Sequence, residues 1–134
     1  MSPVAKAPYI KGETITGGDI TGIIGFAEKT IIGSVALSFP TETALMLYTA
    51  LTGESVGNIT RDVEDSIGEL ANIVAGGAKT VMAGEGLTFH ISIPSVIVGK
   101  KHSINHKVET PVIVVPFEIE GHEFTLEVSM KITK

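Results

Sequence analysis

The chain has no cysteine and no tryptophan among its 134 residues. The absence of thiols excludes a disulfide framework, a cysteine nucleophile and a thiolate metal site. Residues 1–18 carry only scattered apolar side chains, so neither a secretory signal peptide nor a transmembrane helix is expected there. We therefore expect a cytoplasmic protein with no membrane partner.

Aromatic and basic residues are also scarce. Aromatic side chains make up 5% of the chain, and ten Lys and Arg stand against fifteen Asp and Glu, which gives a formal net charge of −5. Contacts to phosphate supply most of the affinity for nucleic acids, so we expect no nucleic-acid partner. A local basic patch at Lys100, Lys101 and Lys107 is interpreted as a solvated loop.

Aliphatic residues are abundant and indicate one globular domain. Hydrophobic residues make up 43% of the chain and charged residues 19%, as in ordinary folded domains. Residues 1–18 contain two Pro and three Gly and are predicted to be a leader or a loosely held edge segment. The domain itself is expected over residues 19–134.

The pattern of β-branched and turn residues predicts the α+β class. A first hairpin is expected over residues 20–27 and 30–39, and a second, around Glu120-Gly121-His122, over residues 111–119 and 123–132. Short strands are expected at 87–91 and 95–98. A helix is expected over 42–51, with Thr41 as its cap and Gly53 at its end. These elements predict a mostly antiparallel sheet built from two long hairpins, with helices packed on one face.

A longer amphipathic helix is predicted from residue 60 to about residue 83. Asn58 or Thr60 is its expected N-cap. At about 100° per residue, the apolar stripe centres near Leu70 and Val74. The apolar residues that recur at spacings of four and three are Val63, Ile67, Leu70, Val74, Ala78 and Val81. The residues expected on the opposite, solvent-facing side are Asp65, Glu69, Asn72 and Gly76.

The glycines of this helix are unusual, because each costs a helix interior about 1 kcal/mol relative to alanine. Gly68, Gly76 and Gly77 surround Glu69 and Asn72, which are neighbours at helical spacing. Small residues around a projecting acid and amide would let another protein come close. Alternatively, the glycines serve close packing against the sheet, and the polar pair is merely exposed.

Metal and nucleotide sites have little support. His102 and His106 have the i, i+4 spacing of two zinc ligands on a helix, but they lie in a polar loop without acids at ligand spacing. Gly99-Lys100 lacks the glycine before it and the Ser or Thr after it that a P-loop requires. We expect no metal site and no cofactor of the chain's own.

Residues 65–80, DSIGELANIVAGGAKT, resemble the signature helix of the CheX/CheC/FliY phosphatases. In that family a Glu-x-x-Asn pair is followed by small residues and then by Ala-Lys-Thr. Residues 19–26 and 87–99 also resemble family segments, and the resemblance covers roughly residues 19–132. One Glu-x-x-Asn pair is visible here, which favours CheX-like over CheC-like proteins, since the latter typically carry two.

The resemblance implies a CheC-like fold and a phosphatase that acts on the aspartyl phosphate of a CheY-type response regulator. Asn72 would orient the attacking water, and Glu69 would bond a lysine of the receiver domain, which itself holds Mg²⁺. The residues expected to contact the partner are Asp65, Gly68, Gly76 and Lys79. The family also implies a homodimer formed through the sheets.

Two points stay open at this stage. Family members of this type usually begin with another helix before the first hairpin, and none is predicted in residues 1–18. The alternative function is a non-catalytic receiver-binding or flagellar-switch-like module of the same fold.

Overall fold

The computed structural model describes residues 3–10, 18–99 and 112–132. Both helices lie between two β-rich parts of the chain, so the predicted α+β class is confirmed. In chain order the elements are β1 (Val4–Ala5), β2 (Tyr9–Ile10), β3 (Ile20–Glu28), β4 (Ile31–Phe39), α1 (Thr41–Thr52), α2 (Arg61–Gly84), β5 (His90–Ile91), β6 (Ser95–Val98), β7 (Ile113–Ile119) and β8 (His122–Ile132).

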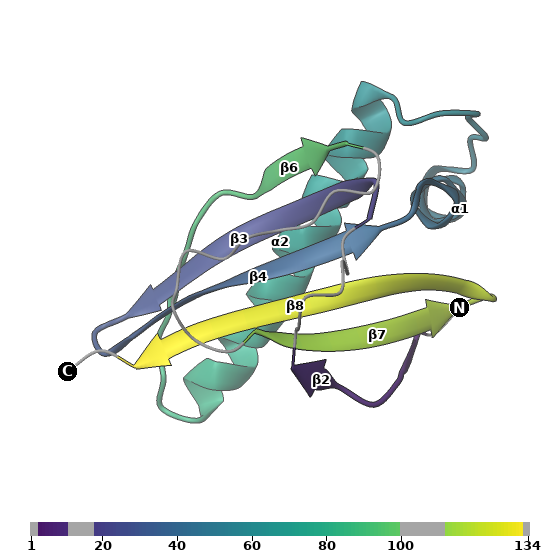
Figure 1. Cartoon of the computed structure of the whole chain (residues 1–134). Helices are drawn as coiled ribbons and strands as arrows, with labels where there is room; N and C mark the ends of the chain where they lie inside the picture. The colour runs from purple at the N-terminus through teal and green to yellow at the C-terminus, as the bar shows by residue number, and fades with distance from the viewer. Residues whose placement is uncertain (1–2, 11–17, 100–111, 133–134) are drawn as a thin grey trace.

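The described strands form one antiparallel sheet in the order β1-β7-β8-β4-β3-β5, with β2 also paired to β7 and β6 to β3 (Figure 1). The two predicted hairpins, β3–β4 and β7–β8, lie side by side because β4 pairs with β8, which sets Leu37 opposite Leu126. At the turn of the second hairpin, Glu120 and Gly121 have φ values of 51° and 78°. Positive φ at both positions gives the turn a twist that matches its strands.

Helix α2 crosses one face of this sheet (Figure 1). The Thr60 hydroxyl accepts a hydrogen bond from the Val63 N–H at 3.3 Å, which confirms Thr60 as the N-cap. Asp62 and Glu64 lie in the first turn, where their negative charges interact favourably with the positive end of the helix dipole and stabilise the helix. The helix therefore begins at a well-defined point close to the site described below.

The predicted centre of the apolar stripe of α2 was wrong. Leu70 is half-buried, Val74 is 39% exposed and Val81 is 68% exposed. Val63 and Ile67 are buried as predicted, and the other buried residues of the helix are Gly68, Ala71 and Ala75. The helix turns its small residues toward the sheet because they allow a close approach: a Cβ added at Gly22 of β3 would lie 2.9 Å from the Ala71 Cβ. A pattern of large apolar residues cannot reveal such a contact.

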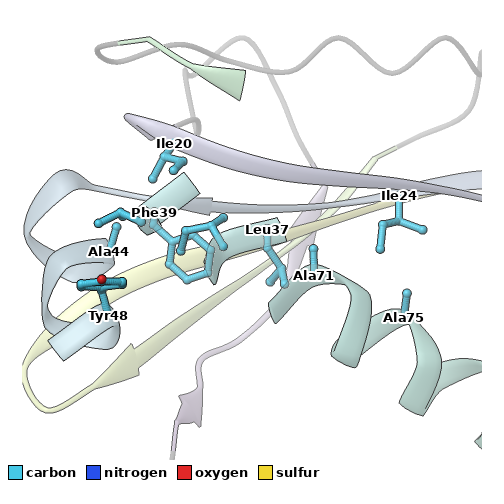
Figure 2. Close-up of a cluster of buried hydrophobic side chains, with 10 residues drawn as sticks. Ile20, Ile24, Leu37, Phe39, Ala44, Tyr48, Ala71 and Ala75 are labelled. Carbon is cyan, nitrogen blue, oxygen red and sulfur yellow. The ribbon is translucent and has the colours of Figure 1, made fainter. Parts of the chain in front are cut away.

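The core lies between the sheet and the two helices. Figure 2 shows side chains from β3, β4, α1 and α2 in one cluster. Phe124 stacks on Phe39 at 5.2 Å between ring centroids and on Phe117 at 5.1 Å, which extends the packing toward β7. The labelled members of the cluster are Ile20, Ile24, Leu37, Phe39, Ala44, Tyr48, Ala71 and Ala75. This packing holds α2 against the sheet.

Helix α1 is capped differently from the prediction. Pro40, not Thr41, occupies the N-cap position and makes no side-chain cap. The backbone N–H and the hydroxyl of Thr41 both donate to Asp19 Oδ2, at 2.9 and 2.8 Å. A carboxylate from just before β3 thus satisfies the helix start, which a local sequence pattern could not indicate. Gly53 ends the helix at φ 79°, as predicted.

Several boundaries differ from the sequence expectations. The first hairpin turns at Lys29-Thr30, since Glu28 pairs with Ile31. The strand expected over 87–91 is limited to β5, whereas β6 has the predicted bounds. Within residues 3–10, β1 and β2 pair with β7. The basic patch at Lys100, Lys101 and Lys107 and the pair His102 and His106 lie outside the described residues.

Candidate active site

An open depression of about 560 Å³ lies beside the N-terminal half of α2. Six of its lining residues come from α2, one from β6 and one from the position just before β6. These residues are Arg61, Glu64, Asp65, Gly68, Glu69, Asn72, Pro94 and Val96. The depression therefore joins the helix face selected from the sequence with an edge of the sheet.

Glu69 and Asn72 are exposed neighbours in this depression. Three residues of α-helix separate them by a rise of about 4.5 Å, so both side chains can reach one small group on a partner. Neither side chain forms a hydrogen bond or ion pair with another of the described residues. Their carboxylate and amide are thus available to a partner, held on a helix that is packed against the core.

The glycines of α2 fall into two groups. A Cβ at Gly68 would lie 3.2 Å from Val96 Cγ2, so Gly68 brings the helix close to β6. A Cβ at Gly76 or Gly77 would meet no atom within 4 Å. Close packing against the sheet, the alternative role considered from the sequence, therefore accounts for Gly68. It does not account for Gly76 and Gly77, which leave the surface beyond Asn72 open.

The structure unites most of the predicted site residues. Asp65 and Gly68 line the depression with the Glu69–Asn72 pair. Gly76 is half-buried one turn beyond Asn72. Lys79 lines a different, apolar groove between the C-terminal half of α2 and the sheet. The residues proposed to contact a partner thus belong to two neighbouring surfaces.

Four lining residues were not singled out from the sequence. Arg61 could have been found, because it lies one helical turn before Asp65 on the same side of α2. Glu64 could have been found too, since it lies in the acidic first turn. Pro94 and Val96 reach the depression through strand pairing with β3, for example Val96 opposite Gly22. No spacing within α2 signals their presence.

The depression carries more negative than positive charge. Glu64, Asp65 and Glu69 line it together with the single cation Arg61. Such a surface favours a partner that offers basic groups. Among the described residues, no cluster of three His, Asp or Glu side chains could hold a metal ion. In the same part of the chain, neither helix combines the length and apolar character needed to span a bilayer.

Comparison with known proteins identifies the family. The model of the chemotaxis phosphatase CheX family matches residues 20–118. The crystal structure of chemotaxis protein CheX from Vibrio vulnificus is 32% identical with a TM-score of 0.92, and the match covers 98% of this chain and 87% of that chain. A CheC-like superfamily protein from Shewanella sp. PV-4 is 30% identical with a TM-score of 0.91, over 98% of this chain and 85% of that chain.

A third solved structure includes a partner. A chain from the CheX–CheY–BeF₃–Mg²⁺ complex of Borrelia burgdorferi is 27% identical, with a TM-score of 0.77, over 97% of this chain and 83% of that chain. No curated protein matches the chain in sequence. The CheC-like fold and the phosphatase class that the sequence predicted are confirmed by the family and structural matches. The chain belongs to the chemotaxis phosphatase CheX family.

Proposed function

We propose that Glu69 and Asn72 are the catalytic residues of this phosphatase and that its substrate is the aspartyl phosphate of a CheY-type receiver domain. The observation that carries the proposal is the position of the pair: both side chains are exposed, adjacent and free of partners among the described residues. The helix that carries them is buried on its other side. The pair can therefore enter a cleft on a second protein without a change in this fold.

Hydrolysis of an acyl phosphate depends mainly on placing a water in line with the phosphorus and on stabilising the charge of the phosphoryl group. The Asn72 amide can accept a hydrogen bond from a water and donate another to a phosphoryl oxygen. It would thus position the water that attacks the phosphorus, while the bond to the aspartate oxygen breaks. Placement of the water is the chemical contribution of this chain.

Glu69 serves as an anchor in this mechanism. Its carboxylate is suited to bond a lysine of the receiver, and such a contact would fix the position of Asn72 three residues away. Mg²⁺ belongs to the receiver domain, in keeping with the complex of the Borrelia burgdorferi relative, which contains Mg²⁺, BeF₃ and CheY. The chain itself needs no cofactor.

The remaining predicted partner contacts follow from the same docking. Asp65 lies one turn before Glu69 in the depression and would meet a basic group on the receiver. Gly76, where a Cβ would meet no atom within 4 Å, would let the receiver backbone approach, whereas Gly68 would act indirectly by allowing β6 to lie close to the helix. Lys79 lines the neighbouring apolar groove, so it would contact acidic groups of the receiver only where that groove borders the interface. We place this reaction in the cytoplasm.

A homodimer is the second partner that we propose. An apolar groove of about 270 Å³ lies between the C-terminal half of α2 and the sheet, and Lys79 is its one charged lining residue. Met82 and Met130 line it and are 40% and 49% exposed. Exposed apolar surfaces of this kind commonly mark contacts between proteins, and a second copy placed here would cover both methionines.

Turnover distinguishes the phosphatase from a non-catalytic receiver-binding module. A phosphorylated CheY-type receiver from the same genome is mixed with substoichiometric amounts of this chain, and the decay of the phosphoprotein is followed. Decay that accelerates in proportion to catalytic amounts of the chain supports the proposal. Binding without acceleration, tested across several receivers, would leave the chain as an interaction module.

A further inference from the structure

An exposed apolar ledge, formed by Ile93 and Pro94, adjoins the candidate active site. Ile93 is 87% exposed, the highest value among the exposed large hydrophobic residues that the structure describes. Pro94, the next residue, lines the same depression as Glu69 and Asn72. Single exposed aliphatic residues are common on protein surfaces, but this one adjoins the candidate site, where a docked partner would remove its apolar surface from water.

The ledge is held in place and is not a loose loop. The Ser92 N–H donates to the Gly25 carbonyl at 2.9 Å, and the Gly25 N–H donates to Ser92 Oγ at 2.9 Å. On its other side, β6 pairs with β3 from the register of Ser95 opposite Ile23 onward. The pyrrolidine ring of Pro94 fixes one backbone angle as well. An apolar side chain on a rigid turn loses little conformational entropy when a partner covers it.

The spacing between the ledge and the catalytic pair is fixed by close packing. Val96 lies two residues after Pro94, and its Cγ2 would be 3.2 Å from a Cβ added at Gly68. Gly68 directly precedes Glu69 on α2. Helix and ledge are therefore packed closely together, and a partner that fills the depression to reach Asn72 would also cover Pro94, because both residues line it.

We propose that the ledge is a second docking element for the receiver domain, which packs an aliphatic patch beside its phosphorylated aspartate against Ile93 and Pro94. The inference rests on the proposed function. The acidic helix face selects basic groups and the ledge selects an apolar surface next to them. Together they form a two-part recognition surface, in which the ledge adds affinity that does not depend on charge and helps to select among similar receivers.

The test measures binding of a receiver loaded with Mg²⁺ and beryllofluoride, by calorimetry, to the full chain and its variants. Ile93→Ser is expected to raise the Kd roughly tenfold, the effect of removing a well-covered apolar contact. Ile93→Val should stay within about threefold of the native Kd. Val4→Ser, at the opposite edge of the sheet and 64% exposed, is the matched control and should leave the Kd unchanged.

Salt and turnover give independent readouts. The ratio of Kd values between Ile93→Ser and native protein should persist at high salt, whereas the ratio for Asp65→Asn should shrink because ionic contacts are screened. In the phosphatase assay, Ile93→Ser should raise KM and leave kcat within about twofold. Unfolding by urea should match that of the native protein, since Ile93 is exposed.

The outcomes separate the ledge from the proposed function. Native-like Kd and KM for Ile93→Ser would overturn the ledge and leave the phosphatase assignment standing. Binding without turnover would end the catalytic assignment, yet a raised Kd for Ile93→Ser would still support the ledge. If the native chain binds no receiver from its own genome, both proposals fall.

Discussion

Glu69 and Asn72 differ in what their side chains can do at a phosphoryl group. A carboxylate is negatively charged and is repelled by the phosphoryl oxygens, whereas an amide is neutral and can both donate and accept. Asn72 therefore suits the water and the phosphoryl oxygen, and Glu69 suits a cation beside them. This difference is the reason for proposing that Glu69 anchors the receiver and that Asn72 positions the attacking water.

Replacing Glu69 by alanine should weaken both binding and turnover. We expect the Kd for a beryllofluoride-loaded receiver to rise roughly tenfold or more, as for loss of a charge-assisted hydrogen bond. The phosphatase activity should fall with it. Glu85→Ala removes the same charge from an exposed position at the other end of α2 and is the control. Equal Kd values for the Glu69→Ala, Glu85→Ala and native proteins would contradict the anchor role.

At the residue scale, most of the candidate site could be predicted from the sequence. Helical spacing alone places Asp65, Glu69 and Asn72 on one face, and the structure brings all three into one depression. The role of Gly68 could not be assigned from the sequence, because a glycine beside a motif can allow either a partner or another element of the same fold to come close. Only the distance to Val96 shows that Gly68 packs against β6.

At the scale of elements, helix α2 is held against the sheet by small residues. Gly22 of β3 and Ala71 of α2 touch closely, since a Cβ added at Gly22 would lie only 2.9 Å from the Ala71 Cβ. Along the same helix, Gly68 allows the close approach of β6. The position of the proposed catalytic pair therefore depends on residues that have no catalytic chemistry of their own.

Gly22→Ala should destabilise the fold by about 1–3 kcal/mol, the usual cost of an extra methyl in a tightly packed interface. Urea unfolding followed by circular dichroism measures this change. Gly57→Ala is the matched control, since its Cβ would meet no atom within 4 Å. A free energy of unfolding for Gly22→Ala equal to that of Gly57→Ala would show that the helix does not depend on this contact.

Gly76 and Gly77 offer a second matched pair within α2. Both positions are helical and unhindered, so alanine at either should stabilise the protein by about 0.5–1 kcal/mol. Only Gly76 lies one turn after Asn72 on the proposed interface. Gly76→Ala should therefore raise the KM for the phosphorylated receiver, and Gly77→Ala should not. Identical KM values for the two variants would remove Gly76 from the interface.

Periodicity predicted the existence of α2 but not its orientation. The large apolar residues Leu70 and Val74 suggested one face, while the sheet accepts Ala71 and Ala75 because small side chains allow closer contact. Val74 and Val81 are left exposed as a result. A hydrophobic pattern reflects only the size and apolarity of the side chains. Here the close approach of α2 to Gly22 of β3 determines which face of the helix is buried.

On the scale of the whole molecule, the exposed apolar groove is relevant to the oligomeric state of the protein. The proposed homodimer should be disrupted by Met130→Lys, which would place a second positive charge beside Lys79 in the groove. Sedimentation equilibrium should report a dimer for the native chain and a monomer for this variant. Leu51→Lys, exposed on α1 outside the groove, is the control and should remain dimeric. A native monomer at high concentration would contradict the proposal.

The overall arrangement was partly predictable. Turn residues and β-branched runs indicated both hairpins, and the class followed from their positions around the helices. The pairing of β4 with β8, which joins the hairpins, depends on contacts about a hundred residues apart, such as Ile31 opposite Ile132. The same kind of long-range pairing, between β6 and β3, brings Pro94 to the candidate active site. Contacts of this kind have no local signal in the sequence.

The most direct test of the catalytic assignment compares Asn72→Ala with the native chain on one phosphorylated receiver. The amide is expected to position water and to add little to docking, so kcat should fall on the order of a hundredfold while the Kd for the beryllofluoride-loaded receiver stays within a few-fold. Because Asn72 is exposed, the variant should unfold like the native protein. Full kcat in the Asn72→Ala variant, with the same receiver, would contradict the mechanism.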